Sequence, residues 1–453
     1  MNDRPATGAG GRPPGWYRVL FFFRRPPEGI PPNHWYLLGV LGVTFLLNQY
    51  DMALLGLALP QIQEGLGIGE AELGSRLGTV RMGVAPAFVL AFLADRSGRR
   101  RLLLLTILGF TACTTLTAFA QTADQFVLCQ FLARSFIAAE EMVAIVVLAE
   151  ELGAHARGWG LGVLAAFGAL GHGVAAIVFG AIEVLPFGWR SLYLVGLAPL
   201  LMLAWIRRGL RETRRFEVER TARGEVSWLR PLAELARRYP GRVIALCGAV
   251  VPFAFVVVPA ASLVSKTLQE VHGFSPPQVT ALMLSFGILV FVGTVLFGSL
   301  GDRFGRKWVM GIGLAVNALG VAFFYNSAGF TVVLAWTFMM FTFVGMDVLF
   351  GALGTELFPT SYRSTASGFR AFVSTVAGAA GLWMEGWLFP QAGSHAAAIT
   401  QMVPIALAAP LVIAFFIPET ARRELEDIAP GTSAPRRAVA APGNPLRNVG
   451  GTS

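Results

Sequence analysis

"LADRSGRR", residues 93–100, and "LGDRFGRK", residues 300–307, are two copies of one charged pattern. Their aspartates, Asp95 and Asp302, lie 207 residues apart. Two further segments recur at nearly the same distance: "EELGAHAR" (150–157) returns in outline as "ELFPTSYR" (356–363), and "RETRRFE" (211–217) as "PETARRE" (418–424). A constant offset of this kind indicates an internal duplication. The sequence therefore predicts two similar halves joined by the charged segment 207–242.

The composition is typical of a membrane protein. Of the 453 residues, 55% are hydrophobic and 14% are charged, whereas soluble domains average about 25% charged residues. Stretches of about 20 apolar residues, long enough to cross a bilayer, recur twelve times. We expect these spans at 35–60, 74–94, 101–121, 125–149, 160–183, 189–206, 243–264, 277–300, 308–327, 329–354, 365–389 and 397–417.

The predicted fold class is an all-α integral membrane protein with two pseudo-symmetric bundles of six transmembrane helices. The expected divisions are a cytoplasmic tail with an interfacial helix (1–33), the first bundle (34–206), a cytoplasmic linker (207–242), the second bundle (243–417) and a cytoplasmic tail (418–453). The interfacial helix is expected in "WYRVLFFFRR", residues 16–25, with aromatic rings at the lipid headgroups.

Basic residues are concentrated in alternate loops, although the net charge of +9 alone could suggest a nucleic-acid partner. Arg96, Arg99, Arg100 and Arg101 follow the second expected span, and many more arginines lie in 207–242. This is the positive-inside pattern, and it places both termini in the cytoplasm. We therefore expect a multi-pass protein of the inner membrane, a monomer, whose partners are the lipid bilayer, protons and a small-molecule substrate, and no nucleic acid.

Enzyme chemistry is not expected. Cys113, Cys129 and Cys247 are isolated within apolar spans, and the five histidines are scattered. This pattern offers neither a metal-ligand cluster nor a nucleophile with a base. A G-x-x-x-x-G-K phosphate loop is also absent from the sequence. We therefore predict no metal, no cofactor and no nucleotide-driven step.

The doubled D-R-x-G-R-[RK] pattern resembles the signature loop of the major facilitator superfamily of secondary transporters. The E-x-x-x-x-x-x-R segments after spans four and ten, the closing "PET" (418–420) and "NQYDMALLG" (48–56) resemble sugar porters and their organic-ion relatives. The resemblance covers residues 35–427. It implies alternating-access transport of a small polar or charged organic solute (organic acid, organic ion or sugar-like metabolite) by proton-coupled symport.

Other functions remain as alternatives to symport. The first is proton-driven efflux of drugs or metabolites, and a non-transporting sensor or an intramembrane enzyme is less favoured. Span seven reads "VVPFAFVVVPAASLV" (250–264), where sugar porters usually carry paired glutamines, and this argues against a sugar.

The resemblance also implies a gate at the cytoplasmic span ends. A carboxylate there can cap a helix N-terminus and pair with an arginine, forming a latch that holds the cytoplasmic side shut in the outward-open state. The predicted gating residues are Asp95, Arg96, Gly98, Arg99, Glu150, Arg157, Asp302, Arg303, Gly305, Arg306, Glu356, Arg363 and Glu419.

Ionisable residues inside the spans are few, and such residues usually mark a substrate pathway or a proton relay. The candidates for proton coupling and the substrate cavity, together with one amide, are Asn48, Asp51, Arg81, Arg134, Glu140, Glu141, His172, Asp347 and Glu385. Helical spacing places several of them on polar stripes that are expected to line one cavity between the halves.

Asp51 is the predicted coupling site. Thr44, Asn48 and Asp51 follow i, i+4, i+7 spacing and share one face of span one. Depth along the helices places Arg81 and Arg134 near the level of Asp51, so either guanidinium is expected to pair with it. The pairing with Arg134 is the one that the resemblance implies. A pair would offset the cost of about 2.5–3.5 kcal/mol for a charge at mid-membrane.

Two choices stay open from the sequence alone. The spacing found in organic-ion relatives favours Glu140, whereas the face shared with Arg134 and the repeat offset to Asp347 favour Glu141. The two glutamates point about 100° apart on a helix, so only one is expected to face the cavity. His172 is interpreted either as a helix-packing hydrogen-bond donor or as a cavity residue.

Overall fold

The computed structural model is all-helical over the residues that it describes, which are 14–20, 26–27, 30–97, 99–207 and 229–420. The first half contains α1 (Gly15–Leu20), α2 (Pro32–Leu57), α3 (Leu59–Leu66), α4 (Glu70–Arg81), α5 (Val84–Ser97), α6 (Arg99–Ala118), α7 (Ala123–Glu151), α8 (Ala154–Gly180), a 3₁₀ turn (Ile182–Val184) and α9 (Trp189–Arg207). The second half contains α11 (Leu229–Arg238), α12 (Pro240–Ser262), α13 (Val264–Lys266), a π-helical turn (Thr267–Val271), α14 (Pro276–Phe304), α15 (Arg306–Asn326), α16 (Thr331–Glu356), a 3₁₀ turn (Thr360–Tyr362), α17 (Arg363–Ala392), α18 (His395–Ala406) and α19 (Ala408–Phe416).

Each of the twelve expected spans contains a helix or a pair of short helices. In the described part of the chain, nine helical stretches are long and apolar enough to cross a membrane by length and composition. The other three expected spans are α4 with α5, α7, and α17. These helices carry Arg81, Arg134 and Glu385, among other polar residues. All three of these spans therefore carry candidate site residues.

Local sequence signals explain several helix boundaries. Ser275 and Gln278 form a capping box that starts α14, and the Thr122 hydroxyl accepts a hydrogen bond from the Gln125 backbone at the start of α7. The second span divides after Arg81, where Gly83 lies so close to α7 that a Cβ would be 2.2 Å from the carbonyl oxygen of Phe131. The division allows the chain to pack tightly against α7.

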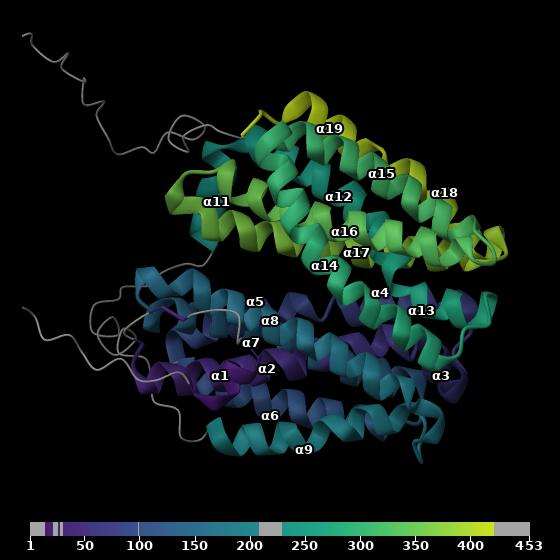
Figure 1. The fold of residues 1–453 in the computed structure, drawn as a ribbon, viewed down its shortest axis with the longest axis horizontal. Helices are drawn as coiled ribbons and strands as arrows, with labels where there is room; N and C mark the ends of the chain where they lie inside the picture. The colour runs from purple at the N-terminus through teal and green to yellow at the C-terminus, as the bar shows by residue number, and fades with distance from the viewer. Residues whose placement is uncertain (1–13, 21–25, 28–29, 98, 208–228, 421–453) are drawn as a thin grey trace, which may run out of the picture.

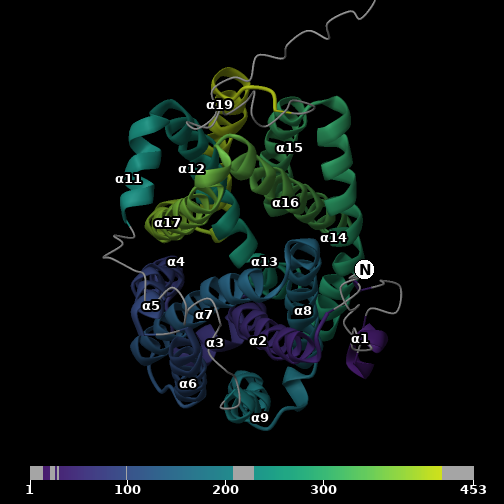
Figure 2. The ribbon, with the colours of Figure 1, turned by 90° about the vertical axis from the view of Figure 1, so that its left-hand side faces the viewer.

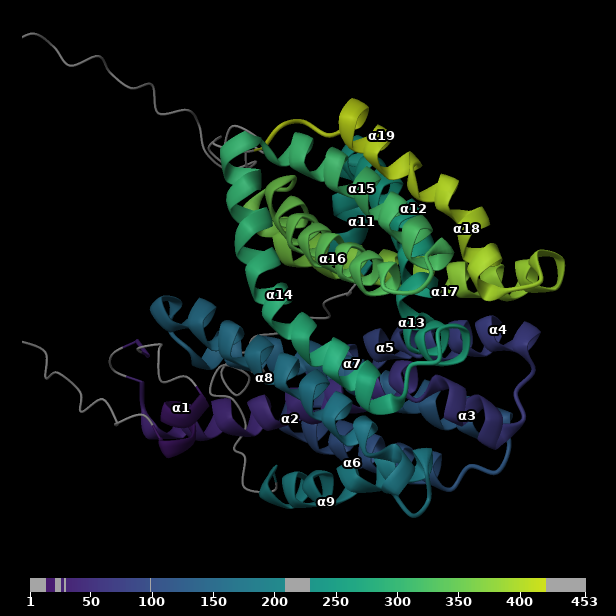
Figure 3. The same ribbon diagram turned by 45° about the vertical axis from the view of Figure 1, so that its right-hand side comes forward.

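The helices form two bundles, one from each half of the chain (Figures 1 and 2). In the first bundle α2 packs along α8 and α6 along α7, and in the second α12 packs along α17 and α15 along α16. The two bundles meet where α4 packs along α17 and where α14 runs beside α8, as Figure 3 shows. This arrangement confirms the predicted fold class.

Glycines allow the close approach of α4 to α17. A Cβ at Gly74 would lie 2.4 Å from the Leu382 carbonyl oxygen, and one at Gly78 would lie 2.9 Å from that of Ala379. Small residues are the usual means by which membrane helices bring their backbones together. The contact between the bundles therefore depends on the absence of side chains at these two positions of α4.

The tail and the linker are partly described, and one aromatic residue of the tail differs from expectation. Tyr17 of α1 is only 2% exposed, and it packs against Trp35 and Trp159 rather than lying at a lipid surface. The expected linker 207–242 contributes α11, which packs on α17, and the start of α12. The repeated segment 211–217 and the part of 418–424 beyond Thr420 lie outside the described residues.

Both ends of the described chain lie at one end of the molecule, which we call the terminal end (Figure 1). The opposite end, called the far end, contains α3, α13 and the start of α4.

Candidate functional site

A cavity of about 290 Å³ lies between the two bundles. The first half contributes Arg81, Arg134 and His172, and the second half contributes mostly apolar groups, including Val258 and Phe343. This volume is at the low end of ligand pockets in proteins. The cavity is therefore suited to a small molecule with an apolar body and a negatively charged group.

Arg81 is the cation in this cavity that lacks a counter-ion. Its guanidinium makes no ion pair and no hydrogen bond within the described part of the chain, and its Nε is buried. The charge that acts on it is another cation, Arg134. The side chain reaches α17, where a Cβ at Gly378 would lie 2.8 Å from Nε. A buried cation without a partner is unfavourable, so this position favours an anionic ligand.

Arg134 is in a different electrostatic setting. It interacts electrostatically with both Asp51 and Glu141, and Glu141 in turn accepts a hydrogen bond of 3.1 Å from Gln49 Nε2. Two carboxylates thus offset the charge of Arg134, whereas no carboxylate in the described ranges offsets that of Arg81.

The direct ion pair expected for Asp51 is absent from the described residues. Asp51 is 3% exposed and accepts a hydrogen bond of 3.0 Å from the Thr114 hydroxyl of α6. Arg134 acts on it only at longer range. Depth along a helix gives the level of a side chain in the membrane but not the neighbouring helix that it faces, and Asp51 faces α6.

The structure places the open candidates as follows. Glu141 is the glutamate near Arg134, whereas Glu140 is fully buried, and neither lines the cavity. His172 lines the cavity while its Nδ1 lies 3.3 Å from the Gly168 carbonyl oxygen of its own helix, so both interpretations of this histidine apply. Asn48 is fully buried, and its amide has no hydrogen-bond partner among the described residues.

Asn48 and Asp51 do not line the cavity either, and two further candidates also lie outside its lining, contrary to expectation. Asp347 has an exposed side chain, 3.7 Å from Arg370 Nη1. Glu385 is fully buried beside His395, toward the far end of α17, whereas Leu382, one helical turn earlier, lines the cavity. The stripe on span eleven therefore continues past the cavity into a second polar cluster.

The motif residues of the second half form a network at the terminal end. Arg306 pairs with Asp302 at 3.1 Å and with Glu356, which accepts a hydrogen bond of 2.7 Å from the Thr420 hydroxyl. Glu419 accepts hydrogen bonds from the backbone nitrogens of Arg306 (2.9 Å) and Lys307 (3.3 Å) and so caps α15.

The capping carboxylate at this turn is therefore Glu419, not the loop aspartate. Gly305 has φ of 97° at the turn from α14 to α15, and a Cβ there would lie 2.5 Å from Glu419 Oε2. Arg303 lies over the ring of Phe304. All of these contacts lie within the second half.

The first copy of the motif is only partly described. The side chains of Asp95, Arg96 and Arg99, and residue Gly98, lie outside the described residues. Glu150, Arg157 and Arg363 lie at helix ends at the terminal end. The latch between the halves thus stays a prediction.

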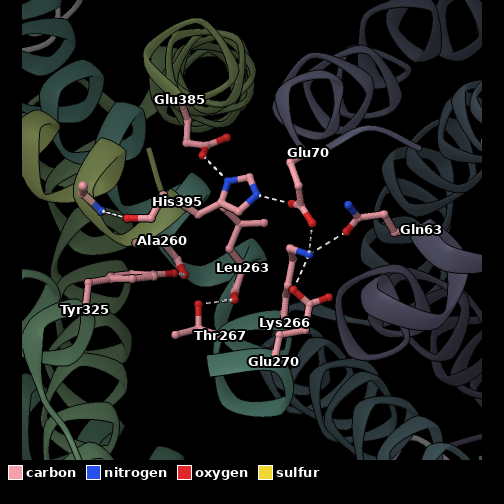
Figure 4. Close-up of polar contacts among 12 residues, drawn as sticks. Gln63, Glu70, Ala260, Leu263, Lys266, Thr267, Glu270, Tyr325, Glu385 and His395 are labelled. Atoms are coloured by element: carbon pink, nitrogen blue, oxygen red, sulfur yellow. Dashed lines mark hydrogen bonds and ion pairs between the residues drawn. The ribbon is translucent and has the colours of Figure 1, made fainter. Parts of the chain in front are cut away.

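The far end contains a polar cluster that our sequence interpretation missed (Figure 4). Lys266 Nζ, 3% exposed, donates to Gln63 Oε1 (2.7 Å), Glu70 Oε1 (3.0 Å) and Glu270 Oε2 (2.5 Å). His395 lies between two carboxylates, with Nε2 2.7 Å from Glu70 Oε2 and Nδ1 2.5 Å from Glu385 Oε1. Gln63 and Glu70 belong to the first half and the others to the second.

A sequence signal for this cluster existed in the repeat. "QEGLG" (63–67) and "QEVHG" (269–273) are 206 residues apart, the same offset as between segments 150–157 and 356–363. Gly67 and Gly273 both adopt positive φ, 63° and 68°. The repeat therefore marks equivalent helix ends that face each other across the two halves.

Contacts between the halves close the far side of the cavity. Within the described ranges, every hydrogen bond between the bundles lies on that side, including Ser265 Oγ to the Leu57 carbonyl oxygen (2.6 Å) and Thr280 Oγ1 to that of Ala176 (2.6 Å). The described hydrogen bonds between the halves are therefore concentrated on the far side of the cavity, and on its other side the rings of Phe88 and Phe372 meet with centroids 5.2 Å apart.

Comparison with known proteins agrees with this architecture. The family model described as Major Facilitator Superfamily matches residues 41–261 and 244–447. The "Probable 4-methylmuconolactone transporter" of Cupriavidus pinatubonensis is 29% identical over 396 residues, covering 84% of this chain and 90% of that protein. The "Cis,cis-muconate transport protein" of Acinetobacter baylyi is 24% identical over 343 residues, covering 72% and 80%.

Among solved structures, "Crystal structure of D-xylose-proton symporter" matches with a TM-score of 0.67 at 18% identity, covering 84% of this chain and 98% of that chain. At this identity the likeness concerns the fold alone.

Proposed function

Because the chain belongs to the major facilitator superfamily, we propose that it carries a small organic anion with an apolar body across the membrane by alternating access, in symport with protons. The family and the relatives indicate a membrane transporter and not an enzyme. The names of both relatives describe small unsaturated organic acids. This supports an acid as the solute of this chain.

The observation that carries the proposal is the guanidinium of Arg81, which faces the cavity and has no partner among the residues that the structure describes. A carboxylate bound there would supply the missing counter-ion and accept charge-assisted hydrogen bonds. The apolar side chains of the second half, such as Val257 and Phe343, would contact the carbon frame of the solute.

Asp51 provides a route for coupling in this proposal. Asp51 and Glu141 both act on Arg134, which lines the same cavity. A proton on Asp51 would remove one of these two negative charges and leave more positive potential for the anion. Proton binding and anion binding would then each strengthen the other, as thermodynamic reciprocity requires.

Orientation follows from charge. The helix ends that flank the arginine-rich segments lie at the terminal end, so we place that end in the cytoplasm of the cell and the far end outside. In this orientation the closure at the far end makes the described conformation inward-facing.

Reconstitution tests the proposal. Purified protein in proteoliposomes would be given radiolabelled benzoate or cis,cis-muconate with an imposed pH gradient, acidic outside, and benzamide as the neutral comparison. Arg81→Gln should weaken acid binding by about 30-fold or more, because it removes one partner of a buried charge pair. Arg76→Gln is the matched control, since Arg76 lies on the same helix but pairs with Glu72 and Asp124 outside the cavity. Equal acid affinity in Arg81→Gln and the control would overturn the assignment.

A further inference from the structure

The contacts across the far-end cluster depend mainly on one carboxylate. Glu70 is the acceptor for both Lys266 and His395, and it belongs to the first half, whereas both donors belong to the second (Figure 4). Gln63 adds one further bond to Lys266. When the bundles separate at this end, Glu70 must leave both cations, and His395 retains only Glu385, which lies in its own half.

Counting protons shows that closure changes the protonation of this cluster. Both ring nitrogens of His395 are within hydrogen-bond distance of a carboxylate oxygen. An ionised carboxylate has no proton to donate, and a neutral imidazole has one. Two protons are needed for the two contacts, so the closed cluster holds one proton more than a neutral imidazole with two carboxylates.

When Glu70 withdraws, the remaining contact between Nδ1 and Glu385 needs one proton only, which neutral imidazole supplies. Closing the far end therefore binds one proton from solvent, and opening it releases that proton. The N–H bond at Nε2 of His395 is the one covalent bond that forms or breaks in this step.

We propose that His395 and Glu385 form a proton-binding site of the external gate, loaded when the gate closes onto Glu70 and unloaded when it opens. The assignment of this gate to the outside rests on the orientation given in the proposed function. The site is separate from the central cavity, which neither residue lines.

The surroundings of His395 support this assignment. On α17, Glu385 is fully buried with Oε2 unpartnered among the described residues, and the ring of Phe389 packs against the imidazole with centroids 4.5 Å apart. On α15, Tyr325 interacts electrostatically with Glu385, but its hydroxyl donates to the Ala260 carbonyl oxygen (2.6 Å). Lys266 is satisfied by Glu70, Glu270 and Gln63.

Glu70 itself stays ionised. It precedes the expected span 74–94, and burial acts to raise its pKa, but hydrogen bonds from His395 and Lys266 outweigh burial and hold the pKa below its ordinary value. The exchanged proton therefore belongs to the pair of His395 and Glu385 in the pH range where an imidazole titrates.

The test measures gate closure without any solute. In a cysteine-free background, spin labels at Val184→Cys in the first half and Phe330→Cys in the second would report the far-end distance by double electron–electron resonance in nanodiscs. Both positions are highly exposed, 83% and 77%. Between pH 8 and pH 5, the ratio of closed to open molecules should rise by up to about tenfold per pH unit, as linkage to one proton requires.

Variants identify the site. His395→Gln should abolish this pH dependence, and Glu385→Gln should move its midpoint lower by roughly one pH unit or more, because a charge beside the imidazolium is lost. The matched control is His272→Gln, since His272 lies at the same end and makes no ion pair within the described ranges.

Two outcomes would overturn the proposal: pH-independent distances in the unmodified chain, or a pH dependence that survives His395→Gln. In one combination of results, Arg81→Gln leaves acid affinity unchanged while His395→Gln abolishes the pH-dependent closure. That combination would refute an organic acid as the solute and would leave the gate assignment standing.

Discussion

Gly74→Ala is expected to shift the conformational equilibrium rather than to unfold the protein. A Cβ at this position would lie 2.4 Å from the Leu382 carbonyl oxygen and 2.7 Å from the Gly386 nitrogen, both backbone atoms of α17. Overpacking of this kind costs about 1–3 kcal/mol. Since α4 and α17 belong to different bundles, opening the far end relieves the clash.

The cost therefore falls on the closed conformation alone, and it should change the ratio of closed to open molecules by about 5-fold to 150-fold. Alanine also favours helix over glycine by about 1 kcal/mol, but it does so in both conformations and does not alter the ratio. The measurement is the distance between labels at Val184→Cys and Phe330→Cys, which should lengthen. Uptake of radiolabelled benzoate should fall, because the inward-facing state is rarely reached.

Gly171→Ala is the control for Gly74→Ala. A Cβ there would lie 2.2 Å from the Leu46 carbonyl oxygen, but both residues belong to the first bundle. The clash is present in every conformation, so this variant should lower the thermal unfolding midpoint and leave the label distance unchanged. Equal label distances in Gly74→Ala and the unmodified chain, or an equal lengthening in Gly171→Ala, would refute the reasoning.

Two other substitutions address coupling and stability. Asp51→Asn keeps the shape of the side chain and its contact with Thr114 but removes a titratable group. Accumulation of labelled acid driven by a pH gradient should therefore disappear, whereas exchange of acid at equal concentrations on both sides should persist. Accumulation by a well-folded variant would place proton coupling at another residue. Glu419→Gln weakens the cap on α15 and should destabilise the protein by about 1 kcal/mol. The midpoint of thermal unfolding should fall while the affinity for the acid stays the same. An unchanged unfolding midpoint would contradict the capping role.

The fold follows from the sequence because each span needs about 20 apolar residues and the duplication fixes how the spans group. Within the cavity, Arg81, Arg134 and His172 could be predicted because an ionisable residue inside a span is costly and rare. The partner of Asp51 could not, since it depends on the rotation of α2 toward Thr114 of α6, and sequence spacing describes one helix at a time.

The gate was harder to predict for a different reason. Lys266, Glu70 and His395 come from three segments near helix ends, and each resembles an ordinary charge at the end of a span. Only the packing of the bundles brings them together. Glu385 was expected in the cavity because it shares a stripe with Gly378 and Gly381, but a stripe does not reveal where along its length the cavity ends.

The bond between Glu419 and the start of α15 has a consequence for the order of biosynthesis. Glu419 follows Arg306 by 113 residues. At a synthesis rate of about 5–20 residues per second, the N-terminus of α15 therefore lacks the Glu419 carboxylate for roughly 6–23 s after Arg306 is added. During that time α16, α17, α18 and α19 are synthesised. A chain stopped at Phe416 would contain every span but would lack both Glu419 and Thr420, so the cap on α15 and the Thr420 bond to Glu356 form only after the last helix has been made.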